Sequence, residues 1–153
     1  MKESGFTLLE VLVAVLVLAI GLLGMAGLMA SSIRNNQSAY QRTQATWLAY
    51  DIVDRMRVNR AVALANGYNT ALGNPAVCAA NPALAGSVAV RDLTGWKTLL
   101  ACALPEGDGA VAVAADRTVT ITVQWNDSRG TGGDSANALQ GDDQQQFQIQ
   151  TRL

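Results

Sequence analysis

The sequence predicts an α+β protein in which a long N-terminal helix packs on a small antiparallel sheet. Residues 11–33 form an apolar run of 23 residues without a charge. Apolar side chains then recur at helical spacing over residues 45–56. Near the C-terminus, two rows of side chains alternate over residues 118–125 and 146–153, which is typical of half-buried strands. We therefore expect one long helix followed by a small sheet.

The composition argues against catalysis. Hydrophobic residues make up 50% of the 153 residues, aromatic residues 5% and charged residues 15%, and histidine is absent. Histidine is the usual general base at neutral pH and the commonest metal ligand. We therefore expect no enzyme activity, no metal site and no cofactor. The formal net charge of −1 also argues against a strongly basic surface that binds nucleic acid.

The apolar run is long enough to cross a membrane, because about 20 helical residues span a hydrocarbon layer of about 30 Å. The run is longer than the core of a secretory signal peptide, and Glu3 offsets the charge of Lys2. An anchor is therefore favoured over a cleaved export signal. Glu10 lies at the edge of the run, where a carboxylate needs a cation or hydrogen-bond donors. Cleavage after Gly5 would create such a cation, the α-amino group of Phe6, one helical turn away.

The hexapeptide at residues 5–10, Gly-Phe-Thr-Leu-Leu-Glu, is followed by Val-Leu-Val-Ala and resembles the leader-peptide junction of type IV pilins and the related pseudopilins. The resemblance implies that a prepilin peptidase cleaves between Gly5 and Phe6 and methylates the new N-terminus, and that Glu10 supports assembly and methylation. It also implies a type IV pilin-like fold. The alternative is a simple single-span membrane protein with Glu10 in the headgroup region.

On this interpretation the chain has four parts. Residues 1–5 are the leader peptide, residues 6–33 the transmembrane helix, residues 34–65 an amphipathic helical extension, and residues 66–153 a periplasmic head. The extension lacks Pro and Gly, so the helix is expected to continue to about residue 65. One face of the extension is apolar and would pack on the head. The side chains of this face are Ala45, Leu48, Ala49, Ile52, Val53 and Met56.

The charges of the chain are distributed unevenly. From residue 31 to residue 65 there are five Arg and two Asp (net +3), whereas the head has five basic and eight acidic residues (net −3). Opposite charges could dock the head on the helix or steer neighbouring subunits together. Arg55, Arg57 and Arg60 are candidate contacts to DNA. Asp51 and Asp54 are, however, spaced for helical ion pairs with the first two, so nucleic-acid binding is not expected.

Residues 34–42 and 49–60 resemble the PilV family of minor pilins, or type IV pilus modification proteins, more than the pseudopilins of type II secretion. This resemblance implies a structural subunit that helps to initiate pilus assembly and enters the pilus with other minor pilins at the tip. The implied partners are other minor pilins, the major pilin, the prepilin peptidase, the inner-membrane assembly machinery and a tip adhesin. The implied location is the bacterial inner membrane, then the pilus. The alternatives are a minor pseudopilin of type II secretion and, more remotely, a DNA-receptor pilin.

The head is predicted to begin with an irregular connection and a short helix that Asp92 caps. Pro105 and Gly107 would end this helix. Its buried stripe would consist of Trp96, Leu99, Leu100 and Ala103. Strands at residues 110–114, 118–125 and 145–153 would follow as an antiparallel meander, with a turn at Asp116 and Arg117.

Cys78 and Cys102 lie 24 positions apart, with no third cysteine and no histidine to complete a zinc site. One disulfide in an oxidising compartment is the favoured interpretation, and two free thiols are the alternative. The interval of residues 126–143 is rich in Asp, Asn and Gly and raises the possibility of a calcium site. Its spacing does not fit the helix-loop-helix calcium pattern, so a flexible hairpin loop is expected there, and whether it binds a ligand stays open.

Overall fold

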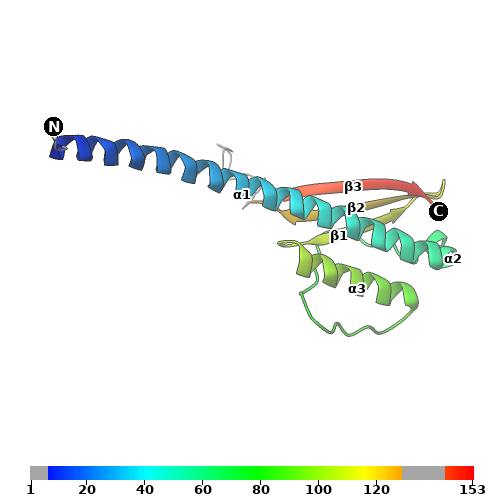
Figure 1. Cartoon of the computed structure of the whole chain (residues 1–153). Coiled ribbons are helices and arrows are strands. Elements are labelled where there is room, and N and C mark those ends of the chain that lie inside the picture. The colour runs from blue at the N-terminus through cyan, green and yellow to red at the C-terminus, as the bar shows by residue number, and fades with distance from the viewer. Residues whose placement is uncertain (1–6, 129–143) are drawn as a thin grey trace.

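A long helix projects from one end of a small head in this computed structural model, which describes residues 7–128 and 144–153 (Figure 1). The expected α+β architecture, an N-terminal helix packed on a small antiparallel sheet, is confirmed. The helices are α1 (Leu8–Val58), α2 (Arg60–Leu64) and α3 (Val88–Ala103), and the strands are β1 (Asp108–Val113), β2 (Thr118–Asn126) and β3 (Gln144–Arg152).

Helix α1 begins at a side chain that bonds within its first turn and ends at one that bonds outside the helix. Thr7 is the N-cap, and its Oγ1 accepts the backbone N–H of Glu10 at 3.3 Å. At the other end Asn59 leaves helical geometry with φ −110° and ψ 45°, and its side-chain amide donates to the Tyr68 hydroxyl at 3.2 Å. An Asn side chain that bonds outside the helix competes with the helical backbone pattern. The helix expected to reach about residue 65 is therefore broken at Asn59.

The two halves of α1 have different surroundings. Large apolar side chains from Leu8 to Ile33 are all exposed, and the most apolar 18-residue window has a mean hydropathy of 2.8 with none of it buried. By length and composition, this helix could cross a membrane. The second half instead supplies a buried face to the head. The apolar residues of that face are Ala45, Ala49, Ile52, Val53 and Met56.

The sheet is a three-stranded antiparallel meander in the order β1-β2-β3. Gly109 of β1 pairs with Val123 of β2, and Ile121 of β2 pairs with Ile149 of β3. The expected strands and the turn between the first two are therefore confirmed, and Arg117 in that turn has a positive φ of 67°. The row of β2 that faces the helices is fully or almost fully buried, and the opposite row is partly exposed.

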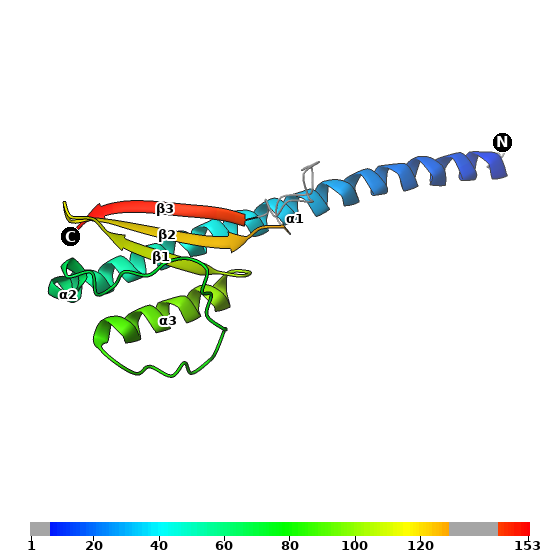
Figure 2. The same ribbon diagram turned by 180° about the vertical axis from the view of Figure 1, so that it is seen from behind.

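Helices α1 and α3 lie alongside each other on one face of the sheet (Figures 1 and 2). The fully buried Trp96 fills the space between α3, α1 and β1, and its indole N–H donates to the Leu48 carbonyl at 2.8 Å. Leu100 on the next turn of α3 is also fully buried. A hydrogen-bonded Trp is a large contribution to a core that has few aromatic side chains.

Helix α3 begins earlier than the sequence predicts. Ser87 caps it by accepting the Val90 N–H at 3.4 Å, so the prediction that Asp92 is the cap was wrong. Asp92 lies inside the helix and accepts a hydrogen bond from Tyr68 instead. Leu99 is also 45% exposed, so its assignment to the buried stripe was wrong, whereas Trp96 and Leu100 are buried as expected.

Two glycines allow a direct test of this packing. An added Cβ at Gly109 would contact the Trp96 ring and would lie 2.7 Å from Leu100 Cδ1, so Gly109→Ala is expected to lower the free energy of unfolding by about 1–3 kcal/mol. The measurement is denaturant unfolding of the full chain in detergent micelles, followed by tryptophan fluorescence.

The matched control is Gly95→Ala in α3. The nearest atom to its added Cβ, Leu84 Cδ2, lies at an ordinary 3.8 Å. Because Ala favours a helix over Gly, this variant should raise the free energy of unfolding by about 0.5–1 kcal/mol. Equal effects of the two substitutions would contradict the packing described for Gly109.

Candidate functional site

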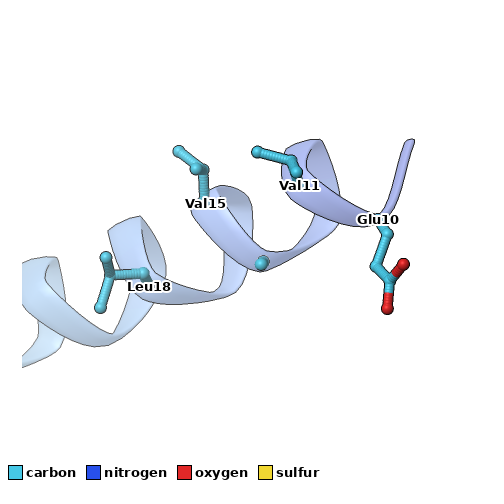
Figure 3. A pocket seen from close by; sticks show the side chains of 5 residues that line it. Glu10, Val11, Val15 and Leu18 are labelled. Atoms are coloured by element: carbon cyan, nitrogen blue, oxygen red, sulfur yellow. The ribbon is translucent and has the colours of Figure 1, made fainter. Parts of the chain in front are cut away.

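The start of α1 is the first candidate site. Gly5 and Phe6 lie outside the described residues, whereas Glu10 lies in the first turn of α1 and is exposed. Its carboxylate extends away from the helix (Figure 3). The unpaired N–H groups at a helix N-terminus favour a nearby negative charge. In water this position suits Glu10, but in a bilayer the carboxylate still requires a cationic or hydrogen-bonding partner.

Glu10 ends an otherwise apolar hollow on the side of α1 (Figure 3). The other residues that line it are Val11, Ala14, Val15 and Leu18. An apolar wall with one carboxylate at its end can accept another apolar helix that carries a positive group at the matching level. Among residues 7–128 and 144–153, no three His, Cys, Asp or Glu side chains are grouped so that they could hold a metal ion.

A polar network joins the end of α1 to α3. The Tyr68 hydroxyl donates to Asp92 Oδ2 at 2.6 Å and accepts from the Asn59 side chain. Arg55 lies between Asp51 at 2.9 Å and Asp92 at 3.7 Å. Burial raises the pKa of Tyr68 above its ordinary value, and the hydrogen bond to Asp92 raises it further. The network links the end of α1 to α3 through hydrogen bonds and an ion pair.

The same contacts bear on DNA binding. Arg55 is paired as described, Arg57 Nη1 lies 2.8 Å from Asp54 Oδ1, and Arg60 donates to the Leu153 carbonyl at 2.8 Å. The two predicted helical ion pairs are therefore present. Each of these arginines already has a partner within the chain, which leaves fewer unpaired charges on this face for phosphate groups.

A second ionic cluster, which the sequence does not predict, lies between α3 and β1. Lys97 Nζ lies 3.1 Å from Asp108 Oδ1, and their side chains are only 12% and 8% exposed. Lys97 also donates to the carbonyls of Ala71 and Asn74, and Asp108 accepts the Gly73 N–H at 2.8 Å. The pair fixes the connection between α2 and α3 against the sheet. No regular spacing in the sequence indicates this contact.

Cys78 and Cys102 form a disulfide with an Sγ–Sγ distance of 2.01 Å. It joins the exposed connection before α3 to the last turn of that helix. The free-thiol alternative therefore does not apply. The chain has no further cysteine, so the two cysteines serve this one cross-link.

The possible calcium loop at residues 126–143 lies mostly outside the described residues. Its first part contains Asp127, which is fully buried and accepts the Ser38 hydroxyl at 2.6 Å. This bond ties the end of β2 to α1 close to the point where the helix leaves the head. Asp127 therefore has a structural role in the described part of the chain.

Comparison with known proteins gives one match. The family model described as the prokaryotic N-terminal methylation motif matches residues 1–26. No curated protein and no solved structure matches the chain. The match supports a type IV pilin-like precursor. It indicates a structural subunit that is anchored in the inner membrane, processed by a prepilin peptidase and assembled with other pilins, and the long helix packed on a small sheet agrees with that fold.

The Tyr68 network predicts a loss of stability in alkali. The folded state holds the Tyr68 proton more tightly than the unfolded chain. The stabilisation that protonated Tyr68 gives the folded state is therefore complete below about pH 10 and is lost as the pH rises through the raised pKa. Tyr68→Phe should remove this pH dependence and cost about 1.5–3 kcal/mol at neutral pH. The measurement is denaturant unfolding at a series of pH values. Tyr40→Phe, at a residue 57% exposed, is the control and should behave like wild type.

The disulfide predicts a second effect on stability. The double variant Cys78→Ser, Cys102→Ser should have a free energy of unfolding about 3 kcal/mol lower than wild type, because the cross-link restricts the unfolded chain. Adding a reductant to wild type should reproduce the loss. Denatured, unreduced wild type should not react with a maleimide, and labelling of both cysteines would contradict the cross-link.

Proposed function

We propose that this chain is a minor type IV pilin of the PilV type that helps to initiate pilus assembly and is incorporated at the pilus tip. The observation that carries the proposal is the N-terminal methylation motif directly before an exposed apolar helix, which continues without a break into the head. A helix of this kind serves as a membrane anchor first and as a filament component afterwards.

The exposed first half of α1 supports assembly by helix bundling. From Leu8 to Ile33 the helix is about 39 Å long at 1.5 Å per residue, which is enough to cross a bilayer with some tilt. The part of the head that the structure describes does not cover this half. When the subunit leaves lipid for a bundle of apolar helices, one apolar environment replaces another, so the transfer exposes little apolar surface to water.

Glu10 would fix the register of that bundle. An unpaired carboxylate in an apolar bundle costs several kcal/mol, and the proposed cleavage between Gly5 and Phe6 creates an α-amino group close to the helix start. The amino group of the same subunit or of a neighbour could pair with the Glu10 carboxylate. An apolar interface alone permits sliding along the helix, whereas one ionic contact selects a single position.

The disulfide supports a head on the periplasmic side. Disulfides persist in oxidising compartments such as the bacterial periplasm, and Cys78–Cys102 lies in the head. The proposed subunit therefore crosses the inner membrane once and exposes the head to the periplasm, before it enters the pilus with other minor pilins and the major pilin. The resemblance of residues 34–42 and 49–60 to PilV-type minor pilins supports the minor role, with a tip adhesin as a further partner.

Processing is tested by the intact mass of the protein purified from membranes. Wild type should begin at Phe6 and carry one added methyl group. Gly5→Val should keep residues 1–5, because a bulky side chain obstructs the peptidase. Glu10→Ala is the matched variant, and it should lose the leader but be depleted from sheared pili. A wild-type protein that retains residues 1–5 would overturn the proposal.

A deletion strain separates the pilus from the secretion machinery. Loss of the chain should reduce surface pili and leave the export of secreted enzymes intact, and wild type supplied in trans should restore pili. Loss of export with normal pili would overturn the pilus assignment and favour a minor pseudopilin of type II secretion. DNA binding by the purified chain that weakens steeply with salt would favour the DNA-receptor alternative.

A further inference from the structure

The two edges of the sheet differ in how they are covered. Thr70 forms an antiparallel bridge with Val111 at the outer edge of β1, through hydrogen bonds of 3.0 Å and 2.9 Å. Asn69 Oδ1 also accepts the Val113 N–H there at 3.1 Å. At the other edge, β3 pairs with β2 alone among the described strands, and it forms the outer border of the sheet in both views (Figures 1 and 2).

The register shows which backbone groups of β3 face that open edge. The Leu153 N–H donates to the Arg117 carbonyl on the β2 side at 3.4 Å. In an antiparallel ladder, successive residues point their N–H and C=O groups to opposite sides, so the odd-numbered residues bond to β2. The even-numbered residues, including Gln146, Gln148 and Gln150, point their backbone groups to the open edge. Nine consecutive pairs without a bulge keep this edge regular.

The open edge lacks the usual protection against strand pairing. Natural edge strands carry Lys, Pro, bulges or inward-pointing charges, whereas β3 has no Pro, and its one charge is Arg152 at its end. Its inward side chains, Phe147, Ile149 and Thr151, are only half-buried, although the inward residues of β2 are fully or almost fully buried. A further strand would cover apolar surface as well as bond to the backbone.

A second copy of the chain does not fit this edge. Antiparallel pairing of two β3 strands keeps both inward rows on one face but points the two α1 helices in opposite directions, so one membrane cannot anchor both in the same orientation. Parallel β3 pairing restores the direction but turns one inward row outward. Pairing of β3 with the β1 edge of a neighbour would keep the two α1 helices in the same direction and both inward rows on the same face. Thr70, however, already occupies the β1 edge.

We propose that the open edge of β3 binds an extended segment of a different protein chain by β-strand addition. The segment would place apolar side chains at every second position, beside Phe147 and Ile149, and polar side chains beside the exposed Gln row. Its backbone would bond to Gln146, Gln148 and Gln150. Only the exclusion of a second copy rests on the proposed function, because it assumes that both copies are anchored in the membrane in the same orientation.

The test uses the full chain in detergent micelles and a nine-residue peptide with the sequence of β2, Thr118–Asn126, which has the required alternation. Amide hydrogen exchange is followed by NMR. Saturating peptide should slow the exchange of the Gln146, Gln148 and Gln150 amides by at least about tenfold and leave the odd-numbered amides unchanged. A peptide of the same composition with its apolar residues grouped together is the control and should have no effect.

Gln148→Pro removes one N–H at the open edge and leaves the ladder to β2 intact, since Pro is tolerated where a strand N–H faces solvent. Gln148→Thr keeps that N–H and is the matched control. Peptide affinity should fall at least about tenfold in the first variant and change little in the second. Wild-type hydrogen exchange provides the test even if the proline variant unfolds.

Two results would overturn the proposal. One is unchanged exchange at Gln146, Gln148 and Gln150 with millimolar β2 peptide. The other is protection of these amides that rises with protein concentration in the absence of peptide, because it would show self-pairing of β3. Neither measurement depends on cleavage after Gly5, so failure of strand addition is distinguishable from failure of the proposed function.

Discussion

The burial of Ala45, Ala49 and Ile52 under α3 and β2 is the contact on which the rest of the structure depends. A three-stranded sheet and one short helix have too little apolar surface for an independent core, so the second half of α1 acts as a wall of the head. Alanine lets the helices approach closely, and Trp96 fills the remaining space and bonds to α1 through its indole N–H. The head therefore cannot shift along the helix without breaking its own core.

This arrangement gives one continuous helix two different environments. Among the described residues, nothing covers the first half of α1. The second half is part of a folded core, and residues 8–58 connect the two halves without a break. Even Gly21, Gly24 and Gly27, each of which weakens a helix in water, lie within it. In the proposed bundle, a position fixed at Glu10 would therefore set the distance and direction of the head, which a flexible linker could not do.

The sequence predicts those helices and strands that have one apolar and one polar face. It does not predict where an element ends when that depends on a hydrogen bond to a residue outside the element. Strands β2 and β3 follow from alternation because one row meets the core. Asn59 breaks α1 and Asp92 does not cap α3 because both bond to Tyr68, which no local spacing reveals. The Lys97–Asp108 pair has no signal in the sequence for the same reason. The motif at residues 5–10 is local chemistry, so sequence alone suggests the processing site.

The connection between α2 and α3 shows how such a head can change its surface and keep its fold. Tyr68 holds its start, Lys97 and Asp108 hold residues 71–74, and the disulfide holds Cys78. Within the described part of the chain, no hydrogen bond holds residues 79–86, which precede the Ser87 cap. Apart from Leu84, whose Cδ2 lies beside Gly95 of α3, and Gly86, which has a φ of +92°, substitutions there would leave the packing of α1, α3 and the sheet unchanged. The sequence of residues 79–86 would then depend on the partners that this segment contacts and not on the core.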